Sequence, residues 1–181
     1  GAYSGLRALG LRSDSFELPK AIDCRDLEEM ILHLKNVSLP ANFKIVLTGT
    51  GRVGRGAREV LEHMKLRSVH PDDFLRMDFP EPVFTHLDVE NYNARTDGGQ
   101  FIMADFIKDP LEFRSTFPRF AQVANLFIAG HFWAEGSPFL FTREDMRHPN
   151  WKVKVVADIS CDIDGPVACT LRPSTIENPI Y

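Results

Sequence analysis

The sequence lacks several features that mark particular classes of protein. None of its apolar runs approaches the roughly 20 residues that a membrane-spanning helix needs, and its first residues lack the pattern of a signal peptide. The 21 lysines and arginines are outnumbered by 25 aspartates and glutamates, which gives a net charge of −4 at pH 7. Because there is no basic stripe to neutralise phosphates, we expect neither a nucleic-acid partner nor a membrane partner.

Cysteine is scarce, and its spacing is uninformative. The three cysteines are Cys24, Cys161 and Cys169, with no CxxC pair among them. An odd number of scattered cysteines indicates reduced thiols, so we expect a cytoplasmic protein. No paired spacing of histidine, cysteine or carboxylate supports a metal site. Internal repeats and low-complexity tracts are absent, and 181 residues suffice for one domain with a sizeable core.

The sequence does contain a glycine-rich turn between a predicted strand and a predicted helix. The apolar run at 45–47 predicts a strand, the motif GTGRVG follows at 49–54, and residues from about 53 to 64 favour a helix. Strand, glycine turn and helix form the opening of a dinucleotide-binding βαβ unit. A glycine-rich turn without a ligand is the alternative.

Each glycine of the motif has its own expected task. Gly49 permits the tight turn, Gly51 leaves room for a pyrophosphate to approach the backbone, and Gly54 lets the helix pack close to the strand. The free N–H groups and the positive dipole end of the helix that starts near Arg52 would then hold the phosphates.

Further segments extend the alternation of strands and helices. Residues 3–10 predict a helix with Leu6 and Leu9 on one face, and residues 26–34 predict an amphipathic helix whose apolar positions are Leu27, Met30, Ile31 and Leu34. Residues 124–130 and 152–158 predict buried strands, and residues 142–146 predict a capped helix. Residues 80–89 indicate an edge strand, 91–99 a loop, and 109–114 a helix with Asp109 as its N-cap.

The end of the second predicted strand, at 67–70, bears on the choice of cofactor. NAD-specific domains place an acidic residue there to hold the adenosine ribose, but this sequence has His70 at the expected distance. His70 with Arg67 would suit the 2′-phosphate of NADP, whereas a displaced Asp72 would suit a free 2′-hydroxyl. The local sequence leaves NAD and NADP open.

Two later strand ends carry candidate site residues, since ligands bind beyond the carboxyl ends of such strands. The first is Gly130-His131-Phe132. For His131, a cofactor contact or a structural role is favoured over catalysis. The second runs from Asp158 to Asp164 and holds acidic residues without a nearby basic one. This acidic segment indicates either a site or an acidic surface turn.

Three segments resemble one family of enzymes. They are Leu47-Thr48-Gly49-Thr50-Gly51-Arg52-Val53 with Gly56-Ala57, Leu140-Phe141-Thr142-Arg143-Glu144-Asp145, and Val156 to Asp162 followed by Ser174-Thr175-Ile176-Glu177-Asn178-Pro179. Together they resemble the lysine-forming saccharopine dehydrogenase family, and most of all the lysine-ketoglutarate reductase portion of bifunctional lysine-degradation enzymes. The same segments are more distantly similar to alanine dehydrogenase and to the soluble part of proton-translocating transhydrogenase.

This resemblance implies an α/β fold, a Rossmann-like doubly wound parallel sheet in three α/β/α layers. Residues 41–181 would form the dinucleotide-binding domain, and residues 1–40 a helical segment that packs on it and connects to another domain. Because the chain starts without Met, in what looks like the middle of a helix, we expect a domain excised from a larger protein. The family's Lys and His acid/base pair belongs to the substrate-binding domain, so the fragment alone should be inactive.

The resemblance also implies a set of site residues. Among them, Gly49, Gly51, Arg52, Val53, Gly130, His131, Asp158 and Ser160 match the family's cofactor-binding positions. With their neighbours and His70, the full predicted cofactor-binding set is Gly49, Thr50, Gly51, Arg52, Val53, His70, Gly130, His131, Phe132, Asp158, Ile159 and Ser160. Asp162 matches an aspartate that lies beside nicotinamide and substrate in alanine dehydrogenases, which makes it the catalytic candidate. His70 departs from the family, where an acidic residue is more usual.

The implied partners are NAD or NADP, a small amino-acid or 2-oxo-acid substrate, and the missing substrate-binding domain; a homo-oligomer stays open. The implied reaction is hydride transfer between nicotinamide and the imine of lysine and 2-oxoglutarate. An alanine dehydrogenase-type enzyme acting on pyruvate and ammonia, and a nucleotide-sensing module without catalysis, are the alternative functions.

Overall fold

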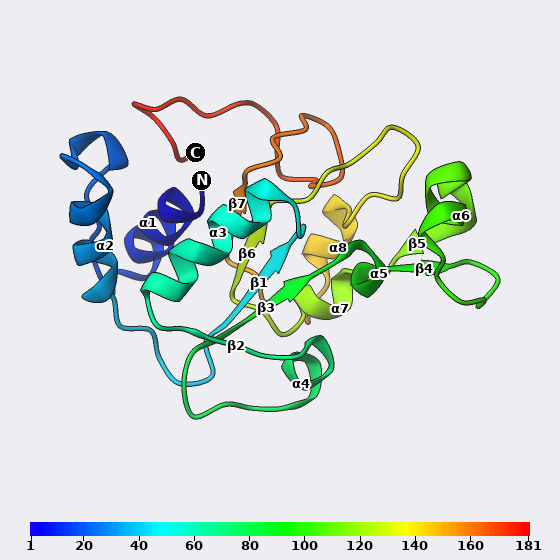
Figure 1. Cartoon of the computed structure of the whole chain (residues 1–181), viewed down its shortest axis with the longest axis horizontal. Coiled ribbons are helices and arrows are strands. Elements are labelled where there is room, and N and C mark those ends of the chain that lie inside the picture. The colour runs from blue at the N-terminus through cyan, green and yellow to red at the C-terminus, as the bar shows by residue number, and fades with distance from the viewer.

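A parallel sheet of five strands forms the centre of the protein, which is described over residues 1–181 by a computed structural model (Figure 1). The strand order is β2-β3-β1-β6-β7. The strands are β1 (Lys44–Thr48), β2 (Arg67–Ser68), β3 (Val83–Leu87), β6 (Leu126–Ala129) and β7 (Val155–Asp158). All pairings within this sheet are parallel, and the predicted Rossmann-like α/β fold is confirmed.

Helices cover both faces of the sheet, which gives three layers (Figure 1). One face carries α1 (Ala2–Ser13), α2 (Leu27–Lys35) and α3 (Arg52–His63); the other carries α4 (Pro71–Arg76), α5 (Val89–Tyr92), α7 (Pro118–Ala121) and α8 (Arg143–Arg147). The alternation of a strand assigns its side chains to the two faces. In β1, Ile45 and Leu47 join the core under α1, α2 and α3, whereas Val46 joins the aromatic-rich core on the other face.

The N-terminal helices agree with their patterns in part. Leu6 and Leu9 of α1 are buried as predicted, and α1 packs against β7 so closely that Gly5 lies on Ala157. In α2 only Leu34 is buried, and Leu27 is 60% exposed. The apolar stripe of α2 is therefore wider than the face that meets the core. No helix of the structure has the length and apolarity needed to cross a bilayer.

A small excursion interrupts the main fold between β3 and β6 (Figure 1). It consists of β4 (Asn93–Arg95) and β5 (Phe113–Ser115), which pair antiparallel, with α6 (Met103–Lys108) between them. Two short 3-10 helices also occur in the chain, η1 (Ala21–Asp23) and η2 (Pro110–Glu112). The predicted loop at 91–99 was wrong for its first residues, which belong to the end of α5 and to β4. The helix start predicted at 109–114 was right in part, because η2 begins after Asp109 as its N-cap, but β5 starts at Phe113.

The edge-strand prediction for residues 80–89 was also wrong. β3 lies inside the sheet between β1 and β2, and Val83, Phe84 and Leu87 are fully buried. Its two polar side chains suggested an exposed strand, but both have partners inside the protein. The Thr85 hydroxyl donates to the Val69 carbonyl at 3.1 Å, and His86 Nε2 donates to the Gly49 carbonyl at 2.7 Å.

Candidate functional site

The carboxyl ends of the central strands meet around the glycine turn. The Gly49 N–H donates to the Leu87 carbonyl of β3 at 3.0 Å, and the Gly130 N–H donates to the Thr48 carbonyl of β1 at 3.0 Å. The turn is thus held between the ends of β3 and β6. This is the edge at which ligands bind in open α/β sheets.

The fold itself requires glycine at two positions of the turn. Gly49 has φ +91°, in the left-handed region, and a Cβ there would overlap the backbone of Gly130 and His131. A Cβ on Gly54 would overlap the Gly49 carbonyl. These contacts agree with the tight turn expected at Gly49 and the close helix packing expected at Gly54.

Gly51 is different, because nothing in the chain requires it. Its backbone is extended, with φ −73° and ψ −169°, and a Cβ would meet no heavy atom within 4 Å. It is the N-cap of α3, and no side chain caps this end of the helix. Thr50, Gly51, Arg52 and Val53 are all exposed. The start of α3 therefore presents open space, uncapped N–H groups and the positive end of a helix dipole.

The end of β6 carries a buried histidine with an incomplete set of hydrogen bonds. His131 Nδ1 lies 2.8 Å from the Thr48 hydroxyl, while Nε2 is buried without a partner in the protein. Burial lowers the pKa of His131 to about 4, against the opposing effect of Asp158, so the ring is neutral at pH 7. The rings of His131 and Tyr92 form a T-shaped pair, with centroids 6.1 Å apart. The next residue, Phe132, is 91% exposed.

The polar groups at the end of β7 mostly satisfy one another. The Asp158 carboxylate accepts from the hydroxyls of Ser160 and Thr170 and from the Cys161 N–H at 3.1 Å. Ile159 packs against Gly1 at the start of α1. The Asp162 carboxylate has no hydrogen-bond partner, and burial, followed by the nearby Asp158 charge, raises its pKa. Asp162 is therefore a partly buried carboxyl group of this loop that no protein group binds.

His70 lies away from these residues. It caps the short helix α4, where its Nδ1 accepts from the Asp72 N–H at 3.3 Å, and its side chain is exposed. It follows β2, which is the edge strand and does not touch β1. The structure thus gathers the glycine turn with the ends of β3, β6 and β7, and leaves His70 at the edge of the sheet.

Two residues at the end of β3 were missed from the sequence. His86 holds the turn through the Gly49 carbonyl, and Asp88 immediately follows the strand with an exposed carboxylate. The available signal was the strand itself, since an inner strand of a parallel sheet ends at the same edge as the glycine turn. Because residues 80–89 were predicted to form an edge strand, their end was not expected beside the glycine turn.

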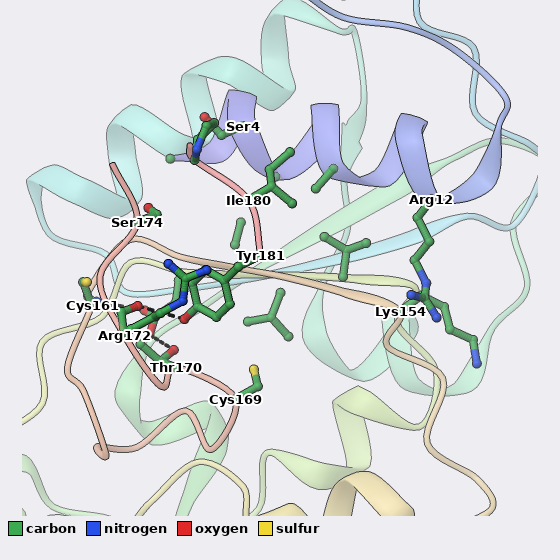
Figure 2. Close-up of a pocket in the computed structure, with 18 of the residues that line it drawn as sticks. Ser4, Arg12, Lys154, Cys161, Cys169, Thr170, Arg172, Ser174, Ile180 and Tyr181 are labelled. Atoms are coloured by element: carbon green, nitrogen blue, oxygen red, sulfur yellow. Dashed lines mark hydrogen bonds between the residues drawn. The ribbon is translucent and has the colours of Figure 1, made fainter. Parts of the chain in front are cut away.

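A cavity lies elsewhere, along the outer edge of β7. Its volume is about 640 Å³, and it is lined by α1, β7 and the C-terminal segment (Figure 2). Arg12 and Lys154 line one side, and Arg172, Thr170 and Cys161 line another. The cavity reaches Asp158, but no residue of the glycine turn lines it. Nowhere in the structure do three or more histidine, cysteine or acidic side chains gather as a possible metal site.

Comparison with known proteins finds relatives of this chain that share one name. The chain is similar to the proteins named alpha-aminoadipic semialdehyde synthase, mitochondrial, of Mus musculus, Rattus norvegicus and Bos taurus, with 28%, 28% and 27% identity over 156 residues. The similarity covers 74% of this chain, and the chain spans 17% of the length of these relatives. No family model matches the chain. The similarity confirms the predicted resemblance to lysine-degradation enzymes and supports an oxidoreductase-type domain.

Proposed function

We propose that this chain is the NAD(P)-binding domain of an oxidoreductase of lysine degradation, related to lysine-ketoglutarate reductase. The whole enzyme would transfer a hydride between nicotinamide and the imine that joins lysine to 2-oxoglutarate. The similarity to the alpha-aminoadipic semialdehyde synthases supports this substrate class over pyruvate and ammonia. The chain would supply the cofactor side of the active site.

The observation that carries the proposal is the open space at Gly51. A glycine that the fold needs has a positive φ or a neighbour that excludes Cβ, as Gly49 and Gly54 do, and Gly51 has neither. A pyrophosphate that approaches the backbone at the start of α3 would explain why this position lacks a side chain. The space and the uncapped N–H groups fit a dinucleotide.

The residues at the strand ends would orient the cofactor, which itself supplies the hydride when bound. The first-turn N–H groups of α3 would hold the pyrophosphate, with the exposed Arg52 adding positive charge. The exposed Phe132 would cover an apolar part of the cofactor. A buried nitrogen without a partner costs about 1–3 kcal/mol, so a polar group brought to His131 Nε2 would recover that energy.

Asp162 would face the substrate. Its carboxylate is free of hydrogen bonds, and its raised pKa lets it hold a proton at higher pH than an exposed aspartate does. The Asp158 side chain, bonded to Ser160 and Thr170, would instead fix the shape of this loop. Ser160 and Ile159 would then line the cleft through the loop rather than act on the substrate.

Calorimetric titration with NAD⁺, NADH, NADP⁺ and NADPH tests the proposal. We expect at least one form to bind with a dissociation constant between micromolar and millimolar. A folded chain that gives no heat with all four, and no shift in melting temperature, would exclude the dinucleotide site.

The cytoplasmic location stays a prediction, and the names of the similar proteins place those relatives in mitochondria. The domain boundary at residue 40 and the homo-oligomer stay predictions as well.

A further inference from the structure

The strand order changes which residue can read the adenosine ribose of a bound dinucleotide. In the common Rossmann order 3-2-1-4-5-6, the ribose-binding acid follows strand 2, which is the neighbour of strand 1. Its carboxylate therefore lies beside the glycine turn. Here the strand that follows α3 along the chain is β2, but the neighbour of β1 on that side is β3. The residue at the expected distance along the chain, His70, therefore follows a strand that is not adjacent to β1.

The register of β1 and β3 places Asp88 directly beside the turn. Thr48 pairs with Leu87 at the ends of the two strands, so the next residues, Gly49 and Asp88, lie side by side. The hydrogen bond from the Gly49 N–H to the Leu87 carbonyl, at 3.0 Å, fixes this arrangement. The spacing between neighbouring strands is about 4.8 Å. Asp88 is thus the acid closest to the start of the phosphate-binding turn along this strand pair.

His70, by contrast, is displaced in two directions. β2 pairs with β3 only, which puts it two strand spacings, about 10 Å, from β1. Ser68 pairs with Phe84, so His70 is level with His86 and does not reach the position of Asp88. Arg67, the other candidate for a 2′-phosphate, is joined to Glu81 by an ion pair of 2.6 Å.

The Asp88 carboxylate has the hydrogen-bonding capacity that a ribose needs. Its side chain caps α5: Oδ1 accepts from the Val89 N–H at 2.7 Å, and the carboxylate forms a capping box with Asn91. The residue is exposed, and no arginine, lysine or histidine forms an ion pair with it. A carboxylate has about four lone-pair sites, so the sites not used for the cap accept hydrogen bonds from ribose hydroxyls, whereas the negative charge repels a 2′-phosphate.

We propose that Asp88 binds the adenosine ribose hydroxyls and makes this domain selective for NAD over NADP. The inference rests on the proposed dinucleotide site and names the cofactor that this site takes. It replaces His70 as the residue that determines cofactor choice. The function of His70 is then to cap α4.

The experiment measures affinities for NAD⁺ and NADP⁺ by calorimetry in the wild type and three variants. Asp88→Asn removes the charge but keeps an oxygen that can cap α5, so the fold should be retained. Glu90→Gln removes the same charge from an exposed neighbour and is the matched control. His70→Ala tests the competing assignment. Melting temperatures verify that each variant is folded.

We expect the wild type to bind NAD⁺ at least about tenfold more tightly than NADP⁺, and Asp88→Asn to reduce that ratio by roughly tenfold or more. Glu90→Gln and His70→Ala should leave the ratio unchanged. A wild-type preference for NADP⁺, or a ratio that responds to His70→Ala and not to Asp88→Asn, overturns the role of Asp88 while the dinucleotide site stands. No binding of either cofactor to folded wild type overturns the site and the role together.

Discussion

At the scale of single residues, His131 couples the stability of the domain to pH. Its pKa is about 4 in the folded protein, against 6.5 for an unperturbed histidine, because burial disfavours the charged ring. Between these values the unfolded chain binds more protons than the folded one. Stability is therefore full above about pH 6.5 and falls as the pH drops toward 4.

We expect acidification across this window to lower the free energy of unfolding by about 3 kcal/mol through His131 alone. Urea unfolding of the wild type and of His131→Gln at several pH values measures the effect. The variant has a neutral side chain, so its stability should depend less on pH in this range. Identical pH profiles for the two proteins would show that His131 is not buried in neutral form.

At the scale of elements, a lysine fixes the end of α4. Lys44 is buried at the start of β1, and its Nζ donates to the carbonyls of Phe74 at 2.8 Å and Met77 at 2.6 Å. These carbonyls belong to the last turn of α4 and to the residue after it. Burial lowers the pKa of Lys44, and the rings of Phe74 and Phe79 lie 5.5 Å and 5.4 Å from its ammonium. The helix is thus attached to the amino end of the central strand.

Lys44→Met should detach α4, because both carbonyls lose a charged donor and one buried hydrogen bond to a charge contributes about 1.5–3 kcal/mol. We expect a loss of stability of this order and faster hydrogen exchange in residues 71–76. Exchange monitored by mass spectrometry checks this, with Lys154→Met, an exposed lysine before β7, as the control. Unchanged exchange in α4 would show that the contacts to Lys44 do not hold the helix.

The elements that could be predicted from the sequence are those whose residues decide their own conformation. Apolar runs gave β1, β6 and β7, the apolar spacing of residues 26–34 gave α2, and a polar cap gave the start of α8 at Thr142. The glycine turn was also readable, because a positive φ and close backbone contacts demand glycine at Gly49 and Gly54.

Strand order could not be predicted in the same way. Whether β3 lies inside the sheet depends on its neighbours, and its polar side chains find partners only in the folded protein, at the Val69 and Gly49 carbonyls. The same limit hid Asp88, whose position beside the turn follows from the register with β1 and not from its distance along the chain.

At the scale of the whole molecule, the proposed function makes this chain one side of an active site. The chain spans 17% of the length of its relatives, and the proposal assigns the Lys and His acid/base pair to a separate substrate-binding domain. We therefore expect the 181-residue chain to bind cofactor without turnover.

Absorbance of NADH and NADPH, followed with lysine and 2-oxoglutarate present, should remain constant when the chain is added alone. The same assay with the longer protein from which such a domain would come is the positive control. Oxidation of either cofactor by the chain alone would place the complete catalytic set within these residues, with Asp162 the first candidate.

The most direct measurement of the central claim uses two exposed glycines of the same segment. Gly51 and Gly56 both have open space at the Cβ position, but only Gly51 lies in the turn before α3. Gly51→Val and Gly56→Val add the same side chain, and neither backbone position has a positive φ, so both proteins should fold with melting temperatures near that of the wild type. In calorimetric titrations with NAD⁺ and NADP⁺, we predict that Gly51→Val abolishes binding and Gly56→Val preserves it. Wild-type affinity in a folded Gly51→Val protein would contradict the dinucleotide site.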